Sequence, residues 1–209
     1  MQTHSEGRSD RKHRAILKAA TTAFLSKGYA GASMDDVAAA AGVSKQTVYK
    51  HFADKERLFT AIILATTDQV DELVRVVAGT LTGDGEVDKA LGELAHQFLG
   101  TLMQPDLLRL RRLVIATADR FPELGRTWYG QGFERVLSTL ATTFQRLADR
   151  RLLHIDDPLM AANHFVGLLL WIPVNRAMFT GDNHGATEAD VQRYAEAAVL
   201  AFLAAYGPR

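Results

Sequence analysis

The chain has 209 residues, of which 47% are hydrophobic and 23% are charged, a composition typical of a globular protein and not of a disordered or fibrous one. It contains no cysteine, which excludes disulfides, thiol catalysis and cysteine-ligated metal sites. The longest unbroken apolar run, Phe165 to Ile172, is shorter than the roughly 18 residues of a membrane-spanning helix. The polar N-terminus lacks the apolar stretch of a secretory signal. The sequence therefore predicts a cytoplasmic protein without a membrane partner.

The formal net charge is zero, but the charges are unevenly distributed. Residues 1–64 contain ten Lys and Arg against six Asp and Glu, whereas residues 65–209 contain fourteen against eighteen. A basic N-terminal segment on an acidic body predicts a polyanionic partner for the N-terminal segment only.

Apolar residues recur at spacings of three and four along most of the chain, which predicts an all-α fold. Near the N-terminus, Gly28 and Gly42 stand where helices should stop, and Ser33 and Ser44 stand where helices should begin. Ser33 and Asp36 have the spacing of a capping box. The three short helices are expected at about residues 10–27, 34–41 and 45–52.

A long fourth helix is expected from Lys55 to about residue 78, long enough to connect the N-terminal segment to the body. The stretch from Gly79 to Gly85 is the clearest predicted linker. Further helices are expected at about residues 87–102, 107–117 and 122–151, and from residues 158 and 188 onward. Gly130 and Gly132 are expected to weaken or bend the helix over 122–151.

The second and third predicted helices have the proportions of a helix-turn-helix, in which a glycine permits the tight turn and the second helix enters the major groove of DNA. Val48 and Phe52 are four residues apart and can anchor the third helix inward. The residues left to face outward include donors and an aromatic ring but no acid. They are Lys45, Gln46, Thr47, Tyr49, Lys50 and His51.

Such a face suits a DNA groove, because lysine can donate to guanine, glutamine can pair with adenine, and tyrosine and histidine can hold phosphates. The competing interpretation is the ordinary polar face of an amphipathic helix. Basic residues that flank the three helices, among them Arg11, Lys12, Arg14 and Lys55, favour DNA.

The run AGVSKQTVYKHFADKERL at residues 41–58 resembles the signature of the TetR family of bacterial transcriptional regulators. Upstream residues also fit the family pattern, so the close resemblance covers about residues 10–64, and the remainder fits in architecture alone. These upstream residues are Ile16, Ala19, Ala20, Phe24, Gly28, Tyr29, Ser33, Met34, Val37 and Ala38.

The resemblance implies a helix-turn-helix DNA-binding domain at residues 1–54, with a short N-terminal arm, and a helical effector-binding and dimerisation domain at residues 55–209. It implies that Ser33, Lys45, Thr47, Tyr49, His51 and Lys55 contact DNA. With Ser44, Gln46 and Lys50 from the face itself, these form the predicted DNA-binding set. Gln46 stands where the family often has glycine or alanine, so this side chain is expected to read a base that many relatives leave alone.

The body has more aromatic and sulfur-bearing residues than a small helical bundle requires. Core packing explains each of them singly, but together they predict an apolar pocket for a drug-sized or lipid-like molecule, with a few polar anchors. The predicted ligand-binding residues are Phe98, Met103, Trp128, Phe144, His164 and Trp171.

The segment from Leu159 to Met178 is apolar almost all round, and a helix of that kind must be covered on more than one side. The last helix has one apolar stripe and many alanines, which allow close helix contact. The two helices together predict a homodimer with a four-helix interface. The predicted interface residues are Phe165, Leu169, Ile172, Tyr194, Ala198 and Phe202.

Features that would indicate an enzyme are weak. Glu93 and His96 have the spacing of a di-iron ligand pair, but such a site needs a second copy, so a surface or hydrogen-bonded histidine is expected at position 96. Arg109, Arg111 and Arg112 are expected to form a solvated helix face. No metal, cofactor or catalytic residue is predicted.

The sequence therefore predicts a homodimeric transcriptional regulator. It is expected to be a repressor that a small apolar or amphipathic effector releases from a palindromic operator in double-stranded DNA. The alternative is a helical-bundle protein that binds a small molecule, or an enzyme, with no role on DNA.

Overall fold

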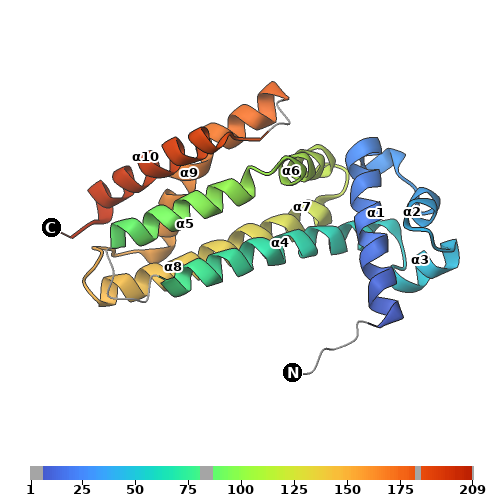
Figure 1. Cartoon of the computed structure of the whole chain (residues 1–209), viewed down its shortest axis with the longest axis horizontal. Coiled ribbons are helices and arrows are strands. Elements are labelled where there is room, and N and C mark those ends of the chain that lie inside the picture. The colour runs from blue at the N-terminus through green and yellow to red at the C-terminus, as the bar shows by residue number, and fades with distance from the viewer. Residues whose placement is uncertain (1–6, 81–86, 182–184, 209) are drawn as a thin grey trace. The chain divides into compact units, whose positions relative to one another are not determined.

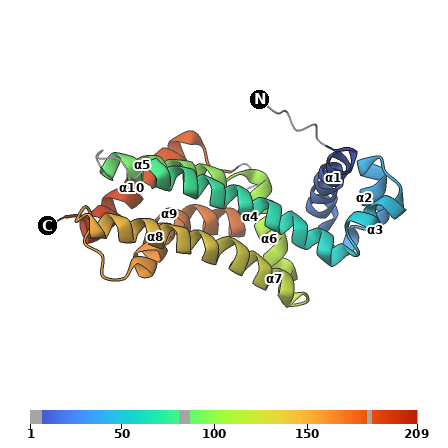
Figure 2. The same ribbon diagram turned by 90° about the horizontal axis from the view of Figure 1, so that it is seen from below.

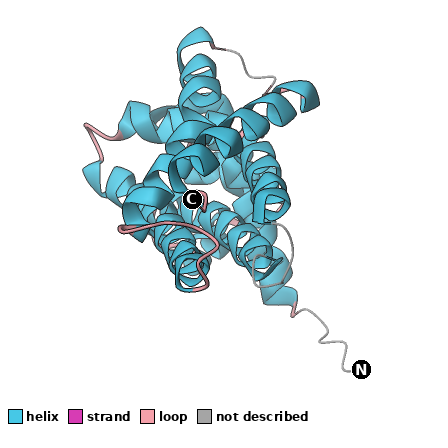
Figure 3. Cartoon of the chain, turned by 90° about the vertical axis from the view of Figure 1, so that its left-hand side faces the viewer, coloured by secondary structure: helices cyan, strands magenta, loops and turns pink. Residues whose placement is uncertain are grey.

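The computed structural model describes residues 7–80, 87–181 and 185–208, without the side chains of residues 67–74, 76–78 and 80, and every regular element in these ranges is a helix (Figure 1; Figure 3). The predicted all-α class is confirmed. The chain forms two compact units, one of residues 1–65 and 113–128 and the other of residues 66–112 and 129–209.

The first unit contains α1 (Arg8–Gly31), α2 (Met34–Ala41) and α3 (Lys45–His51), with the beginning of α4 (Lys55–Thr80), the end of α6 (Pro105–Thr117) and α7 (Pro122–Trp128). Its core is formed by apolar side chains that recur at helical spacing along α1 and on the inner faces of the short helices. The core residues include Ile16, Ala20, Phe24, Val37, Val48, Leu58, Phe59 and Ile63.

Local sequence signals set the ends of these helices. The backbone at Gly28 leaves helical geometry with φ 71°, so α1 has a break at the predicted stop before it continues to Gly31. Ser33 and Asp36 form the predicted capping box of α2. Gly42 ends α2 with φ 63°, a left-handed conformation that favours glycine. Ser44 caps α3.

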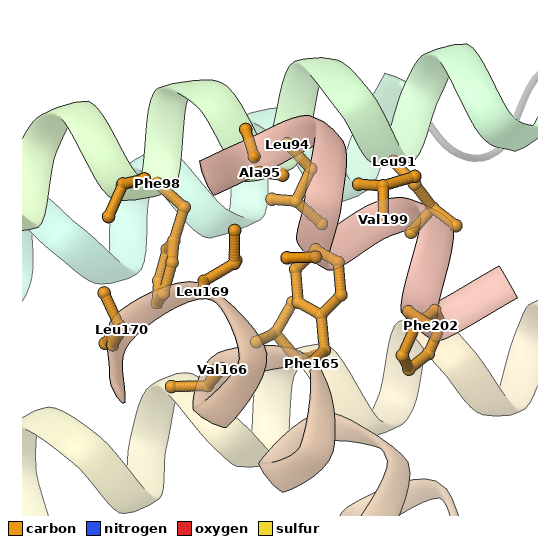
Figure 4. Packing of buried hydrophobic residues seen from close by; sticks show 14 of the residues in the cluster. Leu91, Leu94, Ala95, Phe98, Phe165, Val166, Leu169, Leu170, Val199 and Phe202 are labelled. Carbon is orange, nitrogen blue, oxygen red and sulfur yellow. The ribbon is translucent and has the colours of Figure 1, made fainter. Parts of the chain in front are cut away.

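The second unit contains α5 (Val87–Leu102), the first part of α6, the π-helix η1 (Tyr129–Glu134), α8 (Arg135–Asp149), α9 (Pro158–Thr180) and α10 (Glu188–Tyr206). Within it, α10 packs on α5 and α9, and α9 packs on α8 (Figures 1 and 2). The phenyl rings of Phe144, Phe165 and Phe202 meet at the centre, with centroids 5.1 to 5.6 Å apart. Figure 4 shows Phe165 and Phe202 among the aliphatic side chains of α5, α9 and α10.

The predicted single helix over residues 122–151 is in fact three segments, because the chain passes through η1 between α7 and α8. Gly130 and Gly132 lie inside η1, and glycine is a poor helix former that allows the wider turn. The two glycines therefore alter the helix where the sequence predicted a weak point.

Two further predictions concern the end of α4 and the boundary between domains. Gly79 and Thr80 of the predicted linker are the last residues of α4, and residues 81–86 lie outside the described residues. The boundary between the two units lies within α4, after Ala65, and the first unit also includes the later residues 113–128. The predicted boundary after residue 54 separates the three short helices from the rest and stays a prediction.

One helix in the described ranges, α9, is long and apolar enough to cross a membrane by length and composition alone, with a mean hydropathy of 1.2 over 18 residues, 39% of them buried. The longest apolar run had predicted no such segment. Core helices of soluble proteins pass the same criterion, so α9 is weak evidence for a membrane. Phe165 and Leu169 of α9 are fully buried within the second unit.

Candidate DNA interface and effector unit

Helix α3 is held to the first unit by its apolar side and presents its polar side outward. Val48 is fully buried and Phe52 is 5% exposed, as the four-residue spacing predicted. Lys45, Gln46, Tyr49 and Lys50 are exposed, and these are the residues expected to reach DNA. The helix therefore shows donors and a phenol on one surface with no acid of its own.

The hydroxyl groups in the predicted DNA-binding set have local roles. Ser33 Oγ donates to Asp36 Oδ2 at 2.8 Å and accepts from the Asp36 backbone N–H at 3.1 Å. Ser44 Oγ accepts from the Thr47 backbone N–H at 3.1 Å and lies 2.8 Å from Thr47 Oγ1. These bonds fix the start of α2 and α3, so Ser33 and Ser44 position the helix-turn-helix whether or not they also meet DNA.

Lys45 is the first residue of α3, and its Nζ lies 2.8 Å from Asp35 Oδ1 of α2. The hydrogen bond and charge of Asp35 raise the pKa of Lys45, so the ammonium group stays protonated. Both side chains are more than half exposed, and exposed ion pairs contribute little free energy. A DNA phosphate or guanine can therefore compete for this lysine.

His51 at the end of α3 is half-buried and packs against a second histidine. Its ring centroid lies 5.7 Å from that of His13 in α1, and His13 in turn lies 4.8 Å from Phe52. Burial, and then the nearby His13, Lys50 and Lys12, lower the pKa of His51. At neutral pH His51 is uncharged and offers one N–H and one ring nitrogen acceptor.

Lys55 starts α4 beside the last turn of α1. Its Nζ donates to the Ala30 carbonyl at 3.3 Å and lies 4.7 Å from the ring centroid of Tyr29. Burial and the charge of Arg120 lower the pKa of Lys55. The Phe121 ring, from the turn between α6 and α7, lies 4.6 Å from the Tyr29 ring. Sequence reasoning missed Phe121, since nothing in local spacing reveals a contact between residues so far apart in the chain.

The capping box predicts a pH dependence of stability. Hydrogen bonds from Lys27 and Ser33 lower the pKa of Asp36 from 3.8 to about 2, so the ionised carboxylate stabilises the fold above about pH 4 and this contribution is lost as the pH falls toward 2. We expect Asp36→Asn to lower the Tm at pH 6 and to flatten its fall between pH 4 and pH 2, measured by circular dichroism. A parallel fall in both proteins would contradict this role.

The predicted ligand-binding residues have different surroundings in the described part of the chain. Phe98 and Phe144 are buried in the core of the second unit, and Trp128 is half-buried in the first unit. His164 is exposed, with Nδ1 2.5 Å from Tyr206 Oη, and Trp171 is 73% exposed.

Met103 alone among the predicted ligand-binding residues lines a described hollow. This hollow measures about 180 Å³ and is also bordered by Pro173, Arg176 and Tyr194. A larger groove of about 600 Å³ lies between α5 and α10, where Glu93 and Gln192 form part of its rim. Neither hollow gathers the aromatic set that the sequence suggested.

The predicted interface residues belong largely to the core. Phe165, Leu169 and Phe202 are fully buried and Ala198 is 3% exposed, so these four side chains pack within the single chain. Of the other two, Tyr194 is half-buried under Arg193, whose guanidinium carbon lies 4.7 Å from the ring centroid, and Ile172 is 55% exposed. The large hydrophobic residues left exposed on α9 and α10 are Leu159, Met160, Leu168, Trp171, Ile172, Phe179 and Leu200.

Two polar features of the body were also predicted. His96 Nε2 lies 2.7 Å from Glu188 Oε1, so it is the hydrogen-bonded histidine that was expected. Among the described residues, no group of three or more His, Asp or Glu residues is arranged to hold a metal ion. Arg111 departs from the predicted solvated face, since it is half-buried over the ring of Phe133.

Two family descriptions match the chain. Residues 16–62 match the bacterial regulatory proteins of the TetR family, and residues 89–208 match the C-terminal domain of AefR-like transcriptional repressors. The second match alone spans more than half of the chain.

Curated relatives resemble part of the chain. The transcriptional activator FasR of Mycolicibacterium smegmatis is 33% identical over 90 residues, which are 43% of this chain and 41% of FasR. The transcriptional repressor AcnR of Corynebacterium efficiens is 36% identical over 72 residues, 32% of this chain and 38% of AcnR. The chain thus matches about two fifths of the length of these relatives.

Solved structures resemble nearly all of it. A putative TetR-family regulator from Mesorhizobium loti is 51% identical with a TM-score of 0.90, covering 97% of this chain and all of the other. The flavonoid-responsive regulator FrrA is 32% identical with a TM-score of 0.74, covering 95% of this chain and 98% of FrrA. These relatives are regulators, which confirms the expectation that the chain is not an enzyme. The helix-turn-helix, both family matches and the similarity over almost the whole length show that this chain belongs to the TetR family of bacterial transcriptional regulators.

Proposed function

We propose that the chain is a homodimeric repressor that binds a palindromic operator in double-stranded DNA through α3 and is released by a small effector. The observation that carries this proposal is the outward face of α3, which offers Lys45, Gln46 and Tyr49 and no acid. A helix anchored on its apolar side by Val48 and capped by Ser44 can present such a face to the major groove as a rigid unit.

Base reading is assigned to Lys45 and Gln46, since they begin α3 and the N-terminal residues of a recognition helix meet base edges. Backbone contacts are assigned to Tyr49, Lys50, His51 and Lys55, with Ser33, Ser44 and Thr47 as positioning residues that can also reach phosphates. A neutral His51 can donate one hydrogen bond to a phosphate without adding charge. We also propose a cytoplasmic location, where the bacterial chromosome lies.

We propose that a second copy of this chain packs against the exposed apolar side chains of α9. Leu168, Trp171, Ile172 and Phe179 are 43%, 73%, 55% and 86% exposed, and their spacing of three, four and seven residues places them on one side of the helix. A continuous apolar stripe of this kind is typical of a protein interface. A two-fold dimer brings a stripe against its own copy and gives the protein two recognition helices for a palindrome.

An effector-binding role for the second unit is supported by the match of residues 89–208 to the C-terminal domain of AefR-like repressors. The same match supports repression over activation. FrrA is named a flavonoid-responsive regulator, which supports a small and largely apolar effector. Met103, at the edge of a described hollow, and Phe98, one turn before it, are retained from the predicted lining.

Two helices belong to both units and can transmit the response. Residues 55–65 of α4 and 113–117 of α6 lie in the first unit, whereas the rest of each helix lies in the second. The turn after α6 places Phe121 against Tyr29 and Arg120 near Lys55. An effector that favours a different position of α6 therefore shifts a contact with Tyr29 of α1, whose ring also lies 5.1 Å from that of Phe59 in α4. Tighter binding of the effector to the shifted form is the differential binding that release requires.

Removing the Phe121 ring tests this route. We expect Phe121→Ala to keep operator affinity within about threefold, because Phe121 is not part of α3 and its ring contacts Tyr29 of α1. We expect it to reduce the effector response by most of its coupling, typically 1 to 3 kcal/mol. Fluorescence anisotropy of labelled operator with and without effector measures both quantities. Ile115→Ala, which removes an exposed apolar side chain from α6, is the matched control. An undiminished response in Phe121→Ala would exclude this contact as the route.

The proposed function is tested by selection from random duplex DNA with the purified full chain. We expect a palindromic motif, since a two-fold dimer reads two related half-sites, and an affinity that falls steeply with salt as counterions are displaced. Enrichment of no sequence, or of a single half-site without its inverted copy, would contradict the proposal.

A further inference from the structure

Three arginines lie close together on α6, and they have different surroundings. Arg109 Nη2 lies 2.9 Å from Asp106 Oδ1 at the surface. Arg112 Nη2 donates to the Ala177 carbonyl at 2.7 Å. Arg111 instead lies with its guanidinium carbon 4.9 Å from the ring centroid of Phe133, so its contact is with a π face and not with an oxygen atom.

Arg111 is half-buried, and among the residues that the structure describes no carboxylate pairs with it. Its loss of water is the one cause that lowers the pKa of Arg111 to about 10. The nearest acid along the adjoining π-helix, Glu134, has its carboxylate beside Gly130. At neutral pH the guanidinium therefore keeps its charge in a partly desolvated setting, with no counterion among the side chains that the structure describes.

An uncompensated cation of this kind is unfavourable for folding, and a cation–π contact compensates for only part of the lost hydration. Phe133 lies against one face of the guanidinium plane, and the donors of a guanidinium point outward along its N–H edge. That edge matches the two oxygens of a carboxylate in a planar, bidentate pair. The aromatic partner lies in η1, and π-helical turns recur at functional sites.

We propose that Arg111 and Phe133 form the head-group subsite for an amphipathic effector that has a single carboxylate. This inference rests on the proposed effector-binding role of the second unit and names the chemistry of its ligand. A single negative charge fits because Arg109 and Arg112 already have oxygen partners. Arg111 lies ten residues before Phe121, so the subsite is on the helix that leads to the contact with Tyr29.

The test measures binding by the full-length chain in the absence of DNA, using matched charged and neutral probes. The pairs are octanoate with octanol and 4-butylbenzoate with 4-butylbenzyl alcohol, each titrated by calorimetry. We expect at least one carboxylate to bind about tenfold or more tightly than its alcohol, as a charge-assisted hydrogen bond predicts. Arg111→Gln should remove that preference and leave alcohol binding unchanged, while Arg109→Gln, the matched control on the same helix, should change neither.

Two further measurements separate this role from a structural one. Arg111→Lys keeps the charge but not the planar fork, so it should retain only part of the carboxylate preference. The Tm of Arg111→Gln without ligand should equal or exceed that of the parent chain, because the uncompensated cation is gone. Any of three results would overturn the subsite. The parent chain could bind carboxylates and alcohols equally, Arg111→Gln could lose affinity for both probes equally, or Arg111→Gln could have a lower Tm than the parent chain.

The outcome is distinguishable from that of the proposed function. If the chain selects carboxylates through Arg111 but enriches no DNA sequence, the subsite is supported and the proposed regulatory function is contradicted. If the chain binds a palindrome but shows no Arg111-dependent preference for carboxylates over alcohols, the proposed function is supported and the subsite is contradicted.

Discussion

Trp171→Glu should convert the proposed dimer into a monomer and lower operator affinity by about 100-fold or more. The side chain is 73% exposed in the single chain, and a buried tryptophan removes roughly 150 to 250 Å² from water, which at about 25 cal/mol per Å² amounts to roughly 4 to 6 kcal/mol. Two-fold symmetry applies the change twice per dimer, and each copy also buries a carboxylate without a partner. A monomer has one recognition helix and loses the second half-site.

Sedimentation or light scattering at micromolar concentration, together with anisotropy on operator DNA, measures both effects. Ile115→Glu changes an apolar residue on α6 that is 62% exposed; it is the matched control and should remain dimeric. Phe202, once predicted at the interface, is fully buried, so Phe202→Ala should destabilise the fold by about 3 to 5 kcal/mol and not dissociate a folded dimer. A Trp171→Glu protein that stays dimeric would place the interface elsewhere.

Gln46→Ala should lower affinity for the best operator by about 5- to 150-fold, or 1 to 3 kcal/mol for each lost base contact, and should broaden the preferred sequence at one position of each half-site. The side chain is exposed on the acid-free face of α3, with no described role in the fold. Lys45→Ala should act similarly. Its loss of affinity should be slightly smaller, because in the parent chain Lys45 must give up its weak, exposed ion pair with Asp35 to bind DNA.

Tyr49→Ala is the matched comparison, because this ring is 44% exposed one turn further along α3 and is assigned to the DNA backbone. It should weaken binding to operator and to scrambled duplex about equally. Selection from random DNA with each variant checks the difference. An unchanged motif and unchanged affinity for Gln46→Ala would show that Gln46 does not read a base.

The parts of the structure that the sequence predicted well are those set by local chemistry. Ser33, Ser44 and Gly42 act through bonds to residues within three or four positions, so their pattern alone locates α2 and α3. Val48 is buried, and the sequence could predict this because its neighbours on α3 are polar and only its side of the helix can pack inward. The recognition face follows from these few residues, which is why the candidate DNA interface could be predicted in detail.

The features that the sequence could not determine depend on which of two equivalent sides of a helix packs inward. Helix α9 is apolar all round, so helical spacing gave no reason to prefer Phe165 over Trp171, and only the packing of α8 and α10 decides that Phe165 is buried and Trp171 exposed. The contact between Tyr29 and Phe121 joins distant segments and leaves no periodic trace. Arg111 looked like its neighbours on α6, and its burial over Phe133 depends on the π-helix.

The central claim is that this chain reads a DNA sequence as a regulator. The most direct test is the ratio of its affinities for the selected palindrome and for a scrambled duplex of equal length, measured at physiological salt with the stoichiometry of protein to DNA. We predict a ratio of about 10³ or more, with protomers bound in pairs. A ratio near one, or tight binding by a single protomer, would contradict the account.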